Sequence, residues 1–156
     1  MKHQVTLNIN GSEHEIFVEA RKTLADAIRE ECGLTGTHLG CEHGVCGACT
    51  VLMDGQPVRS CLMFAVQCNG VPLRTVEGLA DGDDLHPVQK AFWEHHGLQC
   101  GFCTPGFLML ATSVLEQEPD IDDEALREVL SSNLCRCTGY QNILIAVKAA
   151  AEEMRG

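Results

Sequence analysis

The sequence predicts an α+β fold in two parts, a β-rich part with one short helix over residues 1–78 and an all-helical part over residues 85–156. Near the start of the chain, apolar residues alternate with polar ones, as in a half-buried strand, at Val5, Leu7 and Ile9. Beyond a loop of residues 78–84, apolar residues instead recur every three or four positions, as on one face of a helix. Each part is small, so a metal centre is expected to stabilise it.

The β-rich part begins with a predicted hairpin and a predicted helix. Asn10-Gly11 provides a turn that tolerates positive φ, and the strand pattern continues over residues 16–18. Thr23 has the position of a helix N-cap, with Asp26 three residues later as in a capping box. The helix ends at Gly33, and its apolar face consists of Leu24, Ala27 and Ile28.

Glycine is concentrated in the next segment, residues 33–48, which indicates a loop with unusual backbone angles. A second hairpin is predicted around the turn Asp54-Gly55, with strands over residues 50–53 and at Val58. A final strand is expected over residues 71–76.

Four helices are predicted in the second part, over residues 87–96, 105–116, 123–134 and 140–154. Pro87 and Pro105 each fall in a first turn, where proline is tolerated. Asp122 has the position of an N-cap. Four short helices with apolar stripes predict a helical bundle.

Composition argues against two classes of partner. The chain of 156 residues has 11 Lys and Arg against 22 Asp and Glu, a net charge of −11, and its aromatic residues are five Phe, one Trp and one Tyr. Such a chain lacks the positive charge and the stacking surfaces that nucleic acid requires. No apolar run approaches the roughly 20 residues of a membrane span. Because the alternating pattern starts close to Met1, no secretory signal is expected, and the protein is expected in the cytoplasm.

Cysteine is the most informative residue type in this sequence. A reducing cytoplasm does not maintain structural disulfides, so dense cysteine there indicates metal or redox chemistry. The ten cysteines are Cys32, Cys41, Cys46, Cys49, Cys61, Cys68, Cys100, Cys103, Cys135 and Cys137.

The first group of cysteines has the spacing of a plant-type ferredoxin. Cys41 and Cys46 are separated by four residues, Cys46 and Cys49 by two, and Cys61 follows after eleven more. This spacing predicts a [2Fe–2S] cluster. A loop around such a cluster turns backbone N–H groups toward sulfur, which requires strained or left-handed φ angles, and the glycines available for this are Gly40, Gly44 and Gly47.

Two other kinds of metal site fit this loop less well. Zinc also binds four thiolates, but its ligands are usually two well-separated pairs rather than three cysteines in nine residues. The segment Cys41-Glu42-His43 resembles part of a Rieske site, but Cys46 and Cys49 bring no second histidine. His43 is therefore expected to be a solvated loop residue.

The second group consists of two pairs, Cys100-x2-Cys103 at the start of the second bundle helix and Cys135-x-Cys137 between the last two helices. The spacing alone is compatible with either a zinc ion or a second [2Fe–2S] cluster. The presence of the first site favours a second cluster, because it would give the first one an electron partner.

The remaining cysteines and the paired histidines have simpler interpretations. Cys32 and Cys68 have no spaced companions and are predicted to be small buried apolar residues rather than ligands. His95-His96, near a helix C-terminus, is predicted to be a surface pair that interacts favourably with the helix dipole.

Three segments together resemble a known family. Gly40 to Thr50 (GCEHGVCGACT), Gln99 to Gly106 (QCGFCTPG) and Asn133 to Tyr140 (NLCRCTGY) are similar to the small iron–sulfur subunit of the molybdenum hydroxylases. This is the xanthine oxidase family, with carbon monoxide dehydrogenases and aldehyde oxidoreductases among its members. The resemblance covers nearly the whole chain, and it implies a β-grasp ferredoxin-like domain followed by a four-helix bundle, each with one [2Fe–2S] cluster.

The resemblance also implies roles for individual residues and for partner subunits. Gln99 and Cys137 match positions that approach the pterin of a molybdenum cofactor, of the molybdopterin cytosine dinucleotide type, in a large subunit. The N-terminal cluster would face the FAD of a medium subunit, in a dimer of heterotrimers. Electrons would pass from molybdenum to the bundle cluster, then to the ferredoxin-type cluster, and then to FAD or another acceptor such as a cytochrome. The implied iron ligands are Cys41, Cys46, Cys49 and Cys61 for one cluster and Cys100, Cys103, Cys135 and Cys137 for the other.

Two alternative functions compete with this electron-transfer subunit. A free-standing two-domain ferredoxin would explain the cysteine spacing of the first part but would give the four cysteines of the helical part no role. A zinc-stabilised interaction module would explain the second part but not the ferredoxin spacing. In the favoured reading the substrate pocket belongs to another subunit, so no catalytic residue is expected in this chain.

Overall fold

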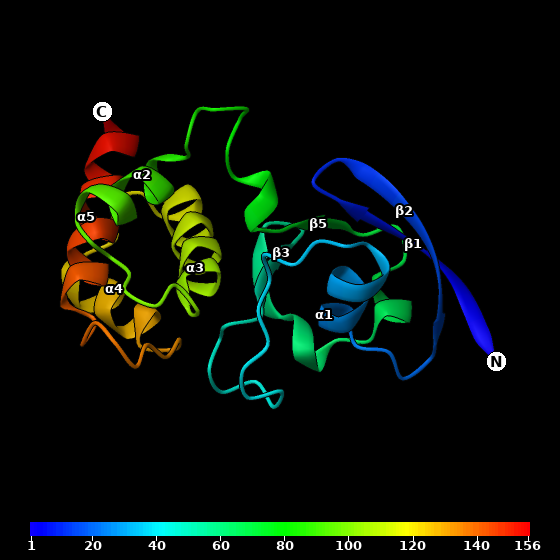
Figure 1. Ribbon diagram of the computed structural model, residues 1–156. Coiled ribbons are helices and arrows are strands. Elements are labelled where there is room, and N and C mark those ends of the chain that lie inside the picture. Colours follow the sequence, from blue (N-terminus) through cyan, green and yellow to red (C-terminus); the bar gives the residue numbers. More distant parts are fainter.

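Five strands form one mixed sheet in the first part of the computed structural model, which describes residues 1–156 (Figure 1). The strand order is β2-β1-β5-β3-β4, and only the central pair β1 and β5 is parallel. The strands are β1 (Lys2–Ile9), β2 (Ser12–Glu19), β3 (Thr50–Met53), β4 (Gln56–Arg59) and β5 (Pro72–Arg74).

One short helix packs on this sheet. It begins as α1 (Leu24–Asp26) and continues as a π-helical segment (Ala27–Glu31). The predicted capping box is confirmed, because the Thr23 hydroxyl accepts a hydrogen bond from the Asp26 N–H at 3.1 Å. The apolar face of this helix joins strand residues in one core, which includes Val5, Leu7, Ile9, Leu24, Ile28 and Val51.

Four helices form the second part, so the predicted α+β fold is confirmed (Figure 1). Helix α3 lies between the sheet and the other helices, and Leu52 of β3 is part of the helical core. The helices are α2 (Pro87–Glu94), α3 (Thr104–Gln117), α4 (Asp123–Leu130) and α5 (Gln141–Arg155). No helix has both the length and the apolar character needed to cross a membrane.

The predicted helix over residues 123–134 is too long, because α4 ends at Leu130. Its N-terminus is as predicted: the Asp122 carboxylate accepts from the N–H groups of Glu124 and Ala125, both at 2.9 Å. At the other end, the Leu134 N–H donates to the Cys46 carbonyl at 2.8 Å rather than to its own helix. The helix has already ended before this contact, because the Ser132 N–H donates to the Val129 carbonyl, three residues back, and the Ser132 hydroxyl donates to the same carbonyl.

The predicted strand over residues 71–76 is also shorter, since β5 covers only Pro72–Arg74. The Thr75 N–H donates to the Asn10 side chain at 2.9 Å instead of to a neighbouring strand. A 3₁₀ turn (Val76–Gly78) follows, and further 3₁₀ turns cover Ser60–Leu62 and Ala65–Cys68. A side-chain acceptor on the opposite turn therefore terminates the strand.

The two parts pack directly against each other. A Cβ atom on Gly106 of α3 would overlap the Gly47 carbonyl oxygen, and one on Gly47 would overlap the side chain of Asn133. The Arg59 guanidinium donates to the Thr50 hydroxyl at 2.7 Å and to the Ser132 carbonyl at 2.8 Å. The cysteine loop and the turn after α4 are thereby held together.

Candidate metal centres

The structure brings four cysteines of the first part together. Cys41, Cys46 and Cys49 lie on the loop before β3, and Cys61 lies on the 3₁₀ turn after β4. Burial raises the pKa of Cys61 to about 11, with a side-chain hydrogen bond to Cys49 adding to the effect and the charge of Cys41 contributing as well. Cys49 and Cys41 are therefore close enough to Cys61 to change its pKa, and Cys46 is close enough to change that of Cys41.

The loop directs backbone N–H groups at the Cys41 sulfur. Those of Val45 and Cys46 lie 3.3 Å from Cys41 Sγ, and that of His43 lies 3.5 Å away. These hydrogen bonds, that of Cys46 first, lower the pKa of Cys41 to about 6. Such donors stabilise a thiolate, which is the form that binds iron.

The glycine prediction for this loop is correct at two positions and wrong at one. Gly44 and Gly47 have φ angles of 84° and 75°, as expected for left-handed residues. Gly40 is not left-handed; a Cβ there would instead make a tight contact of 3.1 Å with the Cys46 sulfur. Glu42 has a φ of 55°, a left-handed position that the sequence did not reveal.

A second group of four cysteines gathers at one end of the helical part. Cys100 and Cys103 directly precede α3, with Cys103 as its N-cap, while Cys135 and Cys137 lie on the loop between α4 and α5. Burial raises the pKa of Cys103 to about 12, and a hydrogen bond to Cys135 and the charge of Cys100 act in the same direction. Cys100 also pairs with Cys137 through their side chains.

Cys135 differs from Cys103 in its hydrogen bonds. Burial alone would raise the pKa of Cys135, but bonds from the hydroxyl and the N–H of Thr138 outweigh it and hold that pKa below its usual value. Thr138 Oγ1 lies 3.1 Å and Thr138 N 3.4 Å from Cys135 Sγ. At Cys100, the N–H of Phe102 lies 3.4 Å from the sulfur and lowers the pKa.

The donor sets fit [2Fe–2S] clusters. In each group the thiols come in two pairs, Cys41 with Cys46 and Cys49 with Cys61 in the first. A binuclear cluster needs one pair of thiolates for each iron. Paired thiols with N–H donors directed at sulfur are therefore suited to a cluster.

Hydrogen bonds connect the chain segments that carry the two groups. The Cys46 carbonyl accepts from the N–H of Leu134, which directly precedes Cys135. The Asn133 side chain also donates to the Gly47 carbonyl at 3.3 Å. No sequence signal linked these segments, since they lie more than 80 residues apart in the chain and share no pattern.

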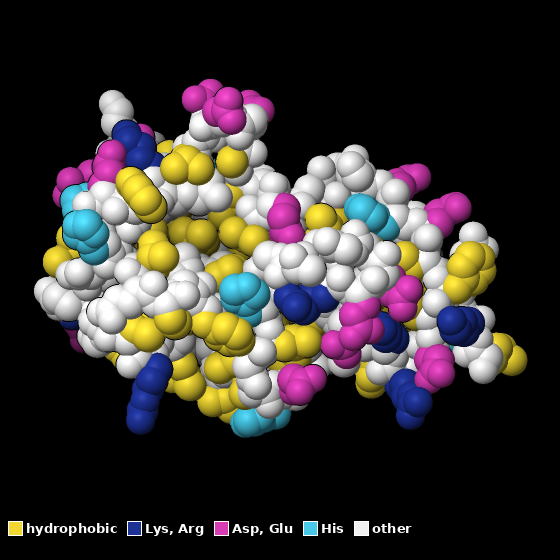
Figure 2. Space-filling model, viewed as in Figure 1, with side chains coloured by type: hydrophobic (Ala, Val, Ile, Leu, Met, Phe, Trp, Pro, Cys, Tyr) yellow, Lys and Arg dark blue, Asp and Glu magenta, His cyan; other side chains and the backbone are white.

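The C-terminal group opens to the surface. Cys100, Cys137 and Gln99 are all exposed. Exposed apolar residues lie close to these cysteines in the chain, and Figure 2 shows hydrophobic atoms in a hollow where the two parts meet and along the lower edge of the molecule. The exposed apolar residues of this kind are Leu98, Phe102, Leu134 and Tyr140.

Of the residues expected not to be ligands, Cys32, Cys68 and the His95-His96 pair lie outside the two cysteine loops, whereas His43 lies within the first. Cys68 is fully buried in the core of the sheet part, as predicted, whereas Cys32 is only half-buried and packs at the edge of that core. His43 is exposed, with its ring nitrogen 2.7 Å from the Cys41 carbonyl. His95 caps the end of α2 and His96 follows it in a left-handed conformation.

Two family models of known proteins match this chain, and they identify the class of protein. One family model, described as a 2Fe-2S iron-sulfur cluster binding domain, matches residues 7–70. A second, described as a [2Fe-2S] binding domain, matches residues 75–148. The protein is thus an iron–sulfur protein with two successive [2Fe–2S]-binding regions.

Individual relatives define the family. The chain is 55% identical over 152 residues to the caffeine dehydrogenase subunit gamma of Pseudomonas sp. (strain CBB1), covering 96% of this chain and 91% of the relative. It is 58% identical over 144 residues to the nicotine 6-hydroxylase small subunit of Paenarthrobacter nicotinovorans, covering 92% and 87%. Among solved structures, quinoline 2-oxidoreductase from Pseudomonas putida 86 matches with a TM-score of 0.94 and 51% identity, covering 99% of this chain and 96% of that one.

The chain belongs to the small iron–sulfur subunits of the molybdenum hydroxylases. Its fold also matches aldehyde oxidoreductase from Desulfovibrio gigas, with a TM-score of 0.92 and 41% identity over 99% of this chain and 17% of that longer one. The protein is an electron-transfer subunit of a multi-subunit oxidoreductase, as the resemblance implied. Neither the free-standing ferredoxin nor the zinc module is favoured.

Proposed function

We propose that the eight grouped cysteines are the iron ligands of the two clusters, with the domains spanning residues 1–78 and 85–156. The observation that carries this proposal is the pairing of thiols, with N–H donors directed at sulfur, in both groups. When bound, each [2Fe–2S] cluster takes up and releases one electron at a time. The two ligand sets are Cys41, Cys46, Cys49 and Cys61, and Cys100, Cys103, Cys135 and Cys137.

Iron content tests the ligand sets. Cys103→Ser is expected to lose about two of the four irons per chain, because its thiolate is one of four that hold a cluster. Cys32→Ser and Cys68→Ser are matched controls outside both groups and are expected to keep all iron. Retention of full iron in Cys103→Ser, or loss of about two irons in either control, would refute the assignment.

The partner of the C-terminal group is a large subunit with a molybdenum–pterin cofactor of the cytosine dinucleotide type. The exposure of Cys100 and Cys137, beside exposed apolar residues, supports a partner surface at this end. Gln99 and Cys137 are the residues that would contact the pterin. A partner that covers this surface would also shield the thiols from water and oxidants.

The partner of the N-terminal group is a medium FAD subunit, within a dimer of heterotrimers. Exposed apolar side chains flank the Cys41 loop: Val45 is 53% and Leu62 58% exposed. Leu62 lies against this loop, since a Cβ on Gly44, the residue before Val45, would meet the Leu62 side chain. Purification of the native complex, with mass identification of its subunits, tests both partners; a stable complex that lacks a flavoprotein would exclude the FAD subunit.

The direction of electron transfer is from the C-terminal group to the N-terminal group. The hydrogen bond from Leu134 to the Cys46 carbonyl supports a direct connection between them. In the Cys103→Ala complex, substrate should still reduce molybdenum, while the N-terminal cluster should stay oxidised during turnover. Rapid-mixing paramagnetic resonance distinguishes the two centres, and unchanged reduction of the N-terminal cluster would contradict this order.

The substrate class of the complex is an N-heterocycle. Relatives and structures at 51–58% identity are named for caffeine, nicotine and quinoline, whereas those named for aldehydes are 38–42% identical. The purified complex should therefore reduce a dye acceptor with an N-heterocycle such as quinoline. A complex active on aldehydes and inactive on several N-heterocycles would refute this substrate class.

A further inference from the structure

The turn after Cys135 carries a hydroxyl that contacts a thiol. Thr138 Oγ1 lies 3.1 Å from Cys135 Sγ, and the Thr138 N–H lies 3.4 Å from the same sulfur. Every other hydrogen bond from a non-cysteine residue to a grouped thiol comes from the backbone, as at Cys41, Cys46 and Cys100. Thr138 is thus the one side chain that donates to a sulfur of either group.

The direction of this hydrogen bond follows from its neighbours. The Tyr140 N–H donates to Thr138 Oγ1 at 3.1 Å, so this oxygen already acts as an acceptor. A ligating thiolate carries no proton and can only accept. The Thr138 hydroxyl proton must therefore point at the Cys135 sulfur when that sulfur binds iron.

Tyr140 fixes the position of this hydroxyl. Its backbone is left-handed, with a φ of 69°, which is uncommon for a residue other than glycine and directs its N–H at Thr138. Its own hydroxyl accepts from the Cys135 N–H at 3.1 Å. Its ring packs edge-on against the buried Phe107 of α3, with centroids 6.4 Å apart.

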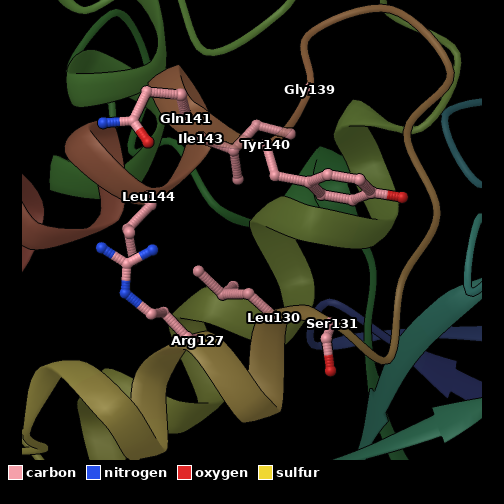
Figure 3. Close-up of a pocket in the computed structure, with 8 residues that line it drawn as sticks. All are labelled: Arg127, Leu130, Ser131, Gly139, Tyr140, Gln141, Ile143 and Leu144. Carbon is pink, nitrogen blue, oxygen red and sulfur yellow. The ribbon is translucent and has the colours of Figure 1, made fainter.

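A pocket lies on one side of the turn that contains Gly139 and Tyr140. Figure 3 shows the Tyr140 ring extending over α3, away from Gln141. Beside the turn lies a pocket of about 380 Å³ between α4 and α5, into which Arg127 projects. The contacts that position Thr138 are therefore those of Tyr140, whose N–H donates to Thr138 Oγ1 and whose ring packs on Phe107.

We propose that the Thr138 hydroxyl, held by Tyr140, raises the reduction potential of the C-terminal cluster. An O–H dipole directed at sulfur stabilises the added negative charge of the reduced cluster more than it stabilises the oxidised one. The inference rests on the proposed role of Cys135 as a ligand. It makes Thr138 a positioning and tuning residue rather than a ligand.

A redox titration of the intact complex, followed by paramagnetic resonance, tests the proposal. Thr138→Val removes the hydroxyl but keeps the shape and the backbone N–H. At a fixed potential near the midpoint, we expect about a tenfold lower ratio of reduced to oxidised C-terminal cluster, a shift of about 59 mV for one electron. The N-terminal cluster should be unchanged.

Thr138→Ser is the matched control, since it retains a hydroxyl, and its potential should lie close to that of the unmodified protein. If Thr138→Val changes the ratio of reduced to oxidised C-terminal cluster by less than twofold, the proposal is overturned. An equal shift of the potential in Thr138→Ser would also overturn it. Loss of C-terminal iron from Thr138→Val would also overturn it, because a residue that only tunes is not needed to hold iron. If Cys135→Ala keeps all iron, the ligand assignment itself fails.

Discussion

The two cysteine groups each bring four thiols and their hydrogen-bond donors together, but they use different parts of the fold to do so. The N-terminal group takes three of its four thiols from one continuous loop, and its sulfur donors are backbone N–H groups. The C-terminal group joins the start of α3 to the loop after α4, and one of its donors is a side-chain hydroxyl. The first arrangement depends on backbone shape, whereas the second depends on how helices and side chains are placed. Substitutions should therefore affect the two groups differently.

The largest expected effect is at the contact that holds the two groups together. In Gly106→Ala, the new Cβ would overlap the Gly47 carbonyl, which is backbone and cannot move aside easily. We expect a loss of about 3 kcal/mol in the free energy of unfolding. Gly70→Ala, with a φ of 73° and no atom within 4 Å of the added Cβ, measures left-handed backbone strain without a clash and should lose only about 1 kcal/mol. Denaturant unfolding that shows equal losses in both would remove the steric explanation.

A smaller effect is expected at Arg59, which connects both groups by hydrogen bonds. Its guanidinium donates to the Gly44 carbonyl at 3.4 Å as well as to Thr50 and Ser132. Arg59→Met should lose about 2 kcal/mol of stability, because these acceptors lose a charged donor. The exposed Arg21 pairs only with Glu19, so Arg21→Met should change stability by less than about 0.5 kcal/mol. Similar losses in the two variants would contradict a connecting role for Arg59.

A pH-dependent effect is expected away from the cysteines, where the sheet part meets α2 and α3. Burial lowers the pKa of His86, Arg74 lowers it further, and Glu116 partly opposes them. The neutral imidazole Nδ1 accepts from the Val88 N–H at 3.2 Å and so caps α2. Because the folded state favours the neutral form, this stabilisation is complete above the unfolded-state pKa of about 6.5 and decreases as the pH falls below it.

The His86 contribution can be isolated with His86→Asn, which keeps a capping acceptor but does not titrate. Between about pH 7.5 and pH 5.5, the unmodified protein should lose more stability than His86→Asn in denaturant unfolding. An equal loss in both proteins would show that other groups account for the pH dependence.

The smallest expected effect is at His43, and it sharpens the contrast with Thr138. His43 donates to the Cys41 sulfur only through its backbone N–H, which alanine retains. The iron content and the potential of the N-terminal cluster should therefore be unchanged in His43→Ala. A shift as large as that in Thr138→Val would mean that side chains tune both groups alike.

Much of the N-terminal group was predictable from local sequence. The spacing from Cys41 to Cys49 and the left-handed Gly44 and Gly47 depend on residues close together in the chain. The same holds for the Thr23 cap, whose two partners are three residues apart. Gly40 was interpreted wrongly because its requirement is a close approach to the Cys46 sulfur, which no backbone preference reveals.

The course of the chain after α4 and the end of β5 were harder to predict, because distant contacts contribute to both. Leu134 after α4 donates to the Cys46 carbonyl, and Thr75 after β5 donates to the Asn10 side chain. The apolar spacing alone extended the predicted helix through residues 131–134, where the chain instead forms a tighter turn.

Thiol spacing, turn residues and apolar periodicity are local properties, so the sequence alone predicted a two-part α+β chain, a ferredoxin-type cluster in the first part and a second cysteine site that spacing left open between zinc and a cluster. The tertiary structure was needed to show how the two parts pack at Gly47 and Gly106, and which atoms donate to each sulfur. Those features depend on side chains and carbonyls brought together from positions far apart, where the closeness of two atoms is set by packing and not by sequence distance.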